Sequence, residues 1–333
     1  MKRLARWTLC LLLLLAACRA SGATRPTVKI GLVAPFEGRY RYVGYGLFAA
    51  VRLALREANA AGGVGTPPYA VELVAYDDGA DPEMARQQAE KLAVDPQVVV
   101  VIGHFREETT RAALPVYARE GLPLLAPAVL DPALTAGPGV VVRIGPDADE
   151  LAARMLEGVA EAGLITDGGP LGEALQRAAS ARGRSLRPVG SPADVPRWEM
   201  LPPVLFCDAP PVDCGEALAS LRARGWTGDL VGGPDLAADE FRAVAGDTAG
   251  VRVVTPWPRP QTLPACADFV ARCTDISLGI PPGDLALPAY AAARHALRAL
   301  EEAIAREGAP SRSGVAAALA AIPTDPLPDP CGE

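Results

Sequence analysis

The sequence has few of the residues that metal binding, acid–base catalysis and nucleic-acid binding require. Only two histidines, His104 and His295, occur in 333 residues, which leaves little material for a histidine metal site or a general base. Acidic side chains outnumber basic ones by 39 to 32, and no basic cluster occurs that would bind nucleic-acid phosphates. The Gly-x-Ser-x-Gly nucleophile motif is also missing. We therefore expect no nucleic-acid partner, no enzyme activity and no cofactor.

The longest apolar run, from Leu9 to Ala17, follows a positively charged start. Roughly nine residues span about 14 Å as a helix, far less than the ~30 Å hydrocarbon core, which favours a signal peptide over a membrane span. The run leads into Leu-Ala-Ala-Cys at residues 15–18, which resembles the lipobox of bacterial lipoproteins. We expect a signal peptide at 1–17, lipidation of Cys18, a tether at 18–26, and a location outside the cytoplasm on a bacterial membrane. The alternative is an ordinary secretory signal in which Cys18 is incidental.

Five cysteines follow this region, at positions 207, 214, 266, 273 and 331. In an oxidising compartment this odd number allows at most two disulfides and leaves one free thiol. Cys207 and Cys214 flank a Pro-Pro pair in an expected loop, so we predict that they form a disulfide. Cys266 and Cys273 would lie about 10.5 Å apart on one helix, so they pair only if that helix breaks. Cys331 is then available to hold the carboxyl-terminal tail.

The body of the chain alternates short apolar strands with amphipathic helices. Strands are expected at 28–33, 70–76, 97–103, 122–125, 164–166, 186–190, 203–207 and 229–231. Helices are expected at 42–61, 82–93, 107–119, 149–162, 171–182, 215–224 and 284–306. Strand–helix repeats of this kind produce parallel sheets with helices on both faces. The predicted fold class is α/β.

Several motifs in this series match a known family in order and spacing. They are Val-Lys-Ile-Gly-Leu-Val-Ala-Pro at 28–35, Glu-Ala-Asn-Ala-Ala-Gly-Gly at 57–63, Tyr-Asp-Asp at 76–78 and Gly-Leu-Pro-Leu-Leu-Ala-Pro at 121–127. The match is continuous over 27–145 and looser at 225–235 and 289–304. The chain resembles the periplasmic binding proteins of the branched-chain amino-acid class, which are the substrate receptors of ABC importers.

The resemblance implies two Rossmann-like lobes, each a parallel sheet flanked by helices, joined by three hinge strands near 142–145, 253–256 and 322–326. The first lobe would contain 27–143 and 257–322, and the second 144–256 and 323–333. The second lobe looks trimmed, because the Pro-rich stretch 191–203 replaces a family helix. A small polar ligand, such as an amino acid or an amide, would bind in the cleft between the lobes, and the partners would be ABC permease subunits in the membrane.

The resemblance also implies a ligand-binding set: Tyr42, Phe105, Arg106, Glu107, Ala128, Leu130, Leu171, Asp235 and Tyr290. Glu107 and Leu130 stand where the family has hydroxyls that hold the ligand carboxylate. Arg106 offers a bidentate partner to an anionic group instead; otherwise Arg106 and Glu107 are solvated helix-start residues. Asp235 matches an acid that receives a ligand ammonium and Tyr290 a pocket-wall tyrosine, although each is alternatively a cap or core residue.

Two further positions bear on this interpretation. The family's small first-lobe disulfide has no partners here, because its positions fall on Ala80 and Arg106. His104 directly follows an expected strand, and we interpret it as a hydrogen-bonded structural histidine. Because the hydroxyl anchors are lost, the alternative to a transport receptor is a ligand-sensing or protein-interaction lipoprotein that keeps the fold.

Overall fold

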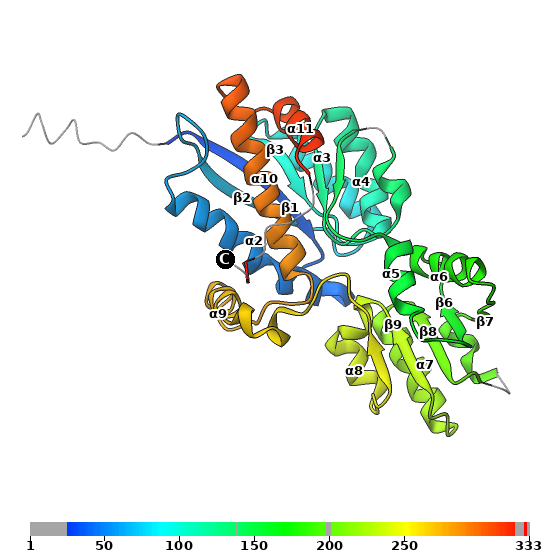
Figure 1. The fold of residues 1–333 in the computed structure, drawn as a ribbon. Helices are drawn as coiled ribbons and strands as arrows, with labels where there is room; N and C mark the ends of the chain where they lie inside the picture. The colour runs from blue at the N-terminus through cyan, green and yellow to red at the C-terminus, as the bar shows by residue number, and fades with distance from the viewer. Residues whose placement is uncertain (1–24, 138, 198–200, 324–329, 332–333) are drawn as a thin grey trace, which may run out of the picture.

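The structure, a computed structural model, describes residues 25–137, 139–197, 201–323 and 330–331 (Figure 1). It contains two five-stranded sheets, one in each lobe, with helices packed around them. The predicted α/β fold with two Rossmann-like lobes is confirmed. Within the described ranges, no helix is both long and apolar enough to cross a membrane.

The first lobe is built on a parallel sheet with the strand order β2-β1-β3-β4-β5. The strands are β1 (Thr27–Ala34), β2 (Ala70–Asp77), β3 (Val98–Ile102), β4 (Leu124–Ala126) and β5 (Val141–Arg143). The central strand β3 reads Val-Val-Val-Val-Ile and is buried throughout, as a parallel strand covered on both faces must be.

Helices cover both faces of this sheet. One face packs against α2 (Arg41–Ala60), α10 (Ala286–Glu307) and α11 (Arg312–Ala321), with α9 (Ala267–Ile276) against α2. The other face packs against α3 (Pro82–Val94) and α4 (Glu107–Glu120). Two short 3-10 helices, η1 (Gly38–Tyr40) and η2 (Pro132–Thr135), precede α2 and follow β4.

The second lobe repeats the architecture with the strand order β10-β9-β8-β6-β7, again parallel. Its strands are β6 (Gly163–Thr166), β7 (Arg187–Gly190), β8 (Val204–Asp208), β9 (Asp229–Gly232) and β10 (Val251–Val253). Its helices are α5 (Ala148–Met155) and α6 (Pro170–Ala181) on one face, and α7 (Pro211–Ala223) and α8 (Asp239–Ala245) on the other. The 3-10 helix η3 (Pro192–Arg197) occupies the Pro-rich stretch.

Two helix boundaries differ by four residues or more from the sequence expectation. The helix expected at 149–162 ends at Met155, and Gly158 follows with a left-handed φ of 72°. The helix expected to begin at residue 215 begins at Pro211, because proline is favoured in the first turn, where its missing N–H costs nothing. Cys214 therefore lies in the first turn of α7 rather than in a loop.

The chain passes between the lobes twice within the described residues. It leaves the first sheet after β5 and returns after β10 toward α9. Of the third expected hinge strand, residues 324–326 lie outside the described ranges. The assignment of the tail to the second lobe is wrong for Cys331, which is bonded to Cys266 and packs against the first-lobe core.

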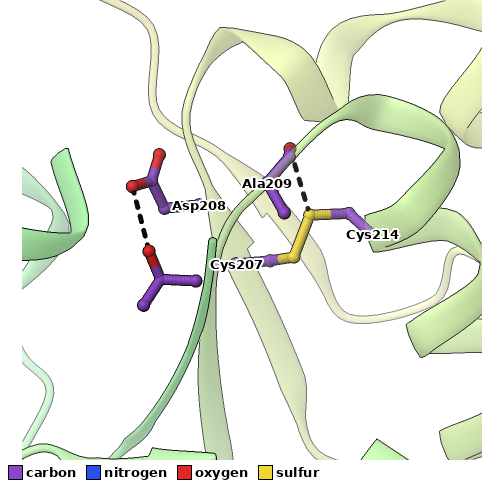
Figure 2. The surroundings of a disulfide bond; sticks show 5 residues. Cys207, Asp208, Ala209 and Cys214 are labelled. Carbon is purple, nitrogen blue, oxygen red and sulfur yellow. Dashed lines mark hydrogen bonds between the residues drawn. A yellow bond between two sulfur atoms is a disulfide. The ribbon is translucent and has the colours of Figure 1, made fainter. Parts of the chain in front are cut away.

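Two disulfides are present among the described residues. Cys207 and Cys214 are bonded, as the sequence predicted, with their Cα atoms 6.2 Å apart (Figure 2). Cys266 pairs with Cys331, and Cys273 is a buried free thiol. The first disulfide ties the end of β8 to the start of α7, and the second holds the tail to the first lobe.

The two disulfides should differ in their contribution to stability, because the loops they close differ in length. The sequence separations are 65 residues for Cys266–Cys331 and 7 for Cys207–Cys214. Chain entropy predicts that replacing Cys266 and Cys331 with serines costs about 4 kcal/mol of unfolding free energy. Replacing Cys207 and Cys214 should cost about 2 kcal/mol. Urea unfolding of the two double variants checks this order; a larger loss for Cys207 and Cys214 would contradict it.

Candidate functional site

A cavity of 1130 Å³ lies between the lobes. Its first-lobe wall is formed by the start of α2 and by the loops that follow β3 and β4. Its second-lobe wall is formed by the loops that follow β6, β8 and β9. In open parallel sheets, ligands bind beyond the carboxyl ends of the strands, and the cavity occupies that place on both lobes.

Eight of the nine sequence-predicted ligand residues line this cavity: Tyr42, Phe105, Arg106, Glu107, Ala128, Leu130, Leu171 and Asp235. They come from both lobes, and the fold brings them together from positions up to 193 residues apart, the separation of Tyr42 and Asp235. Their contact with a ligand stays a prediction.

Tyr290 does not line the cavity, so its prediction as a pocket-wall residue is wrong. Its side chain is buried in the first-lobe core, and its hydroxyl donates to Glu57 Oε2 at 2.7 Å. The ring packs edge-on against Phe269, with centroids 5.6 Å apart. Tyr290 therefore joins α10 to α2, which is the core role that the sequence had left open.

Arg106 projects from the N-cap position of α4 toward the second lobe. Its guanidinium lies 3.4 Å from Asp235 Oδ2 and 3.2 Å from Glu108 Oε1, and it stacks over the Tyr40 ring at 4.2 Å. Burial lowers the pKa of Arg106, but the nearby carboxylates of Asp235 and Glu108 outweigh it and hold the pKa above its usual range. Arg106 is a half-buried, permanently charged cation at the centre of the cleft.

Asp235 is the second-lobe partner of that cation. It lies in the 3-10 helix η4 (Pro234–Ala237), directly after β9. Besides pairing with Arg106, it accepts a hydrogen bond from the Tyr42 hydroxyl at 3.1 Å. Burial and the Asp235 carboxylate both raise the pKa of Tyr42. Both partners of Asp235 belong to the first lobe, so this carboxylate connects the two lobes inside the cleft.

Glu107 has a different role from Arg106. Its Oε1 accepts hydrogen bonds from the backbone N–H groups of Leu130 at 2.6 Å and Asp131 at 3.2 Å. Burial raises the pKa of Glu107, although these two hydrogen bonds oppose the rise. The interpretation of Glu107 as a solvated helix-start residue is therefore wrong, because its carboxylate ties the loop after β4 to the start of α4.

Two acidic residues of the second lobe were missed by the sequence analysis. Asp167 follows β6 and Asp208 is the last residue of β8, and both line the cavity. Asp208 Oδ2 accepts a hydrogen bond from the backbone N–H of Gly172 at 2.7 Å, and this bond caps the start of α6. Figure 2 shows Asp208 beside the disulfide. Burial raises the pKa of Asp208 to about 6. The signal that would have identified both is an acidic residue directly after an apolar strand expected from the sequence, at 164–166 and at 203–207.

The cavity lining carries more acid than base. Its arginines each pair with an aspartate: Arg106–Asp235, Arg111–Asp131, Arg177–Asp149, Arg242–Asp239 and Arg259–Asp284. Among these pairs in the described residues, Arg106–Asp235 is the one whose partners lie on opposite lobes. A movement of one lobe away from the other would therefore break this ion pair and leave the other four intact.

The raised pKa of Asp208 predicts a pH-dependent stability. Because folding favours the protonated carboxyl, the unfolding free energy of the wild type should fall by roughly 2 kcal/mol relative to that of Asp208→Asn as the pH rises from about 4 to about 7. The asparagine keeps an oxygen for the Gly172 N–H. Urea unfolding of both proteins at the two pH values measures the difference. Parallel pH profiles for wild type and Asp208→Asn would contradict the raised pKa.

Comparisons with known proteins agree with this architecture. The chain is 32% identical over 136 residues to the leucine-specific-binding protein of Salmonella typhimurium, a match that covers 40% of this chain and 35% of that protein. It is also 32% identical over 143 residues to the Leu/Ile/Val-binding protein of Escherichia coli K12, covering 41% and 38%. The matched stretch thus spans little more than a third of these relatives.

Solved structures match over far more of the chain. A leucine binding protein from Thermotoga maritima aligns with a TM-score of 0.75 at 20% identity, covering 88% of this chain and 87% of that one. A putative branched-chain amino acid ABC transporter structure from Rhodospirillum rubrum aligns with a TM-score of 0.64 at 25% identity, covering 89% of each chain. A family model described as periplasmic binding protein matches residues 27–189 and 202–333, and the chain belongs to that family.

Proposed function

We propose that this protein is an extracytoplasmic solute receptor that delivers a small zwitterionic ligand, an amino acid or a close analogue, to an ABC permease. Its family and its two-lobed cleft support a binding role outside the cytoplasm. The relatives named above are binding proteins for leucine, or for leucine, isoleucine and valine. The ligand, the permease and the lipid anchor are proposals for this chain.

The observation that carries the proposal is the pair formed by Arg106 and Asp235 across the cleft. A guanidinium binds a carboxylate through two parallel hydrogen bonds, and a carboxylate binds an ammonium through charge-assisted ones. A ligand with both groups therefore pairs its carboxylate with Arg106 and its ammonium with Asp235, in place of the contact between these two residues. A ligand with a single charge that separates the pair leaves one of the two ions without its partner from the opposite lobe, which is costly for a half-buried charge.

The same pair explains how binding would move the lobes. Arg106 and Tyr42 belong to the first lobe and Asp235 to the second, so a ligand held by all three bridges the cleft. A ligand that makes its full contacts only when the lobes are together shifts the equilibrium toward the closed form. Phe105 and Leu171 line the cavity from opposite lobes and offer apolar contacts to a side chain.

The requirement for two charges can be tested with three matched compounds. L-leucine carries both groups, isoamylamine lacks the carboxylate and 4-methylpentanoate lacks the amine. By calorimetry we expect each single-charge compound to bind about 100-fold more weakly than L-leucine, and Arg106→Gln or Asp235→Asn to lose a similar factor for L-leucine.

The control for this test is Arg39→Gln, which breaks an exposed cross-lobe pair with Asp213 (3.8 Å) that does not line the cavity. Its L-leucine affinity should change by about twofold at most, because exposed pairs contribute little.

Thermal unfolding in the presence of each of the twenty amino acids tests ligands with side chains other than that of leucine. A ligand at 100 times its dissociation constant stabilises the folded protein by about 2.7 kcal/mol. No shift with any of them would overturn the receptor proposal in favour of the protein-interaction role.

The lipid anchor rests on the sequence at 15–18, which lies outside the described residues. Cys18→Ser should abolish the incorporation of radioactive palmitate in growing cells, because the thiol that receives the diacylglyceryl group is gone. Cys10→Ser, in the apolar run of the signal, is the matched control and should keep the label. A label that persists in Cys18→Ser would refute lipidation at that residue.

A further inference from the structure

A chain of three buried polar side chains adjoins the loop that carries Arg106. His104 Nδ1 lies 2.7 Å from Asp78 Oδ2, and His104 Nε2 lies 3.0 Å from the Tyr117 hydroxyl. Asp78 and His104 are fully buried and Tyr117 is 2% exposed. None of the three lines the cavity, so none is positioned to touch a ligand there.

The hydrogen bonds among these three side chains are complementary. With the hydrogen on Nδ1, His104 donates to Asp78, and its Nε2 accepts the hydrogen of the Tyr117 hydroxyl. The other Asp78 oxygen accepts from the backbone N–H of Ala80 at 3.0 Å. Buried polar groups are tolerated only when such partners are present, and a fully satisfied network is rigid. The three side chains therefore favour one arrangement of the segments that carry them.

Those segments meet at the base of the Arg106 loop. Asp78 follows β2, His104 follows β3 and Tyr117 lies in α4. The Thr110 hydroxyl donates to the carbonyl of Arg106 at 2.7 Å and lies 3.3 Å from that of His104. The segment from His104 to Arg106 is thus held by its histidine ring on one side and by its carbonyl groups on the other.

The backbone before this segment is equally constrained. Gly103 has a φ of 135°, and a Cβ there would lie 2.3 Å from the carbonyl oxygen of Val33. Its N–H donates to Leu125 O at 3.0 Å. The exit of the chain from β3 is therefore fixed against β1 and β4, and the direction of Arg106 depends on the residues that follow.

We propose that Asp78, His104 and Tyr117 are positioning residues of the ligand site, which fix the loop that aims Arg106 at Asp235. The inference rests on the proposed function for its ligand measurement. The hydrogen bond between Asp78 and His104 connects the loop after β2 to the loop after β3, which carries Arg106.

The test uses Tyr117→Phe, which removes one hydroxyl, and Val116→Ala as a matched control. Val116 is the preceding residue of α4, 3% exposed, in the same core cluster. Both variants should lower the urea midpoint. By calorimetry, Tyr117→Phe should weaken L-leucine binding about five- to tenfold and Val116→Ala about twofold or less. In the Arg106→Gln background, Tyr117→Phe should have no further effect, because the residue that it positions is absent.

A second measurement needs no ligand. In the unliganded protein, the Nε–Hε signal of Arg106 in a ¹⁵N NMR spectrum should be resolved in the wild type and in Val116→Ala. In Tyr117→Phe it should merge with the signals of the exposed arginines. If none of the twenty amino acids binds the wild type, the receptor proposal fails by itself, and this spectrum still tests the positioning role. An unchanged Arg106 signal in Tyr117→Phe, or equal affinity losses in both variants, would overturn the positioning role.

Discussion

The ion pair between Arg106 and Asp235 is the contact on which the rest of the site depends. Each lobe contributes one of its two charges, and both side chains are only partly exposed, at 22% and 36%. A charge in such a place needs a partner, because its desolvation is otherwise uncompensated. In the unliganded chain the partner is the opposite lobe. A zwitterion is the small molecule that replaces both partners at once, which links ligand chemistry to the movement of the lobes.

The two departures from the family at Glu107 and Leu130 are connected through one set of hydrogen bonds. The Glu107 carboxylate accepts hydrogen bonds from the backbone N–H groups of Leu130 and Asp131, so these two donors of the loop after β4 are paired within the protein. Its negative charge is directed at that loop and away from Arg106, whose own partners are Asp235 and Glu108. The absence of hydroxyls at positions 107 and 130 and the presence of an arginine at 106 are therefore consistent with the proposal that Arg106 binds the anionic group of the ligand.

Much of the fold and most of the site could be predicted from the sequence. The all-apolar strand Val98–Ile102 and its neighbours specify a parallel sheet, and a residue directly after such a strand has little freedom in where it lies. Phe105, Arg106 and Asp235 line the cavity, as the resemblance to the family implied, and each lies within four residues of the end of a strand. Tyr290 was not, because the face that a helical residue presents depends on the rotation of α10 against α2, which motif spacing does not determine. The partner of Cys331 depends on a tail whose path no local pattern encodes.

A crystal structure of the protein with L-leucine bound tests the central claim most directly. We expect the ligand carboxylate within hydrogen-bond distance of the Arg106 guanidinium, the ammonium on Asp235, and the direct contact between these two residues lost. A complex in which Arg106 and Asp235 remain paired while the ligand occupies another part of the cavity would contradict it.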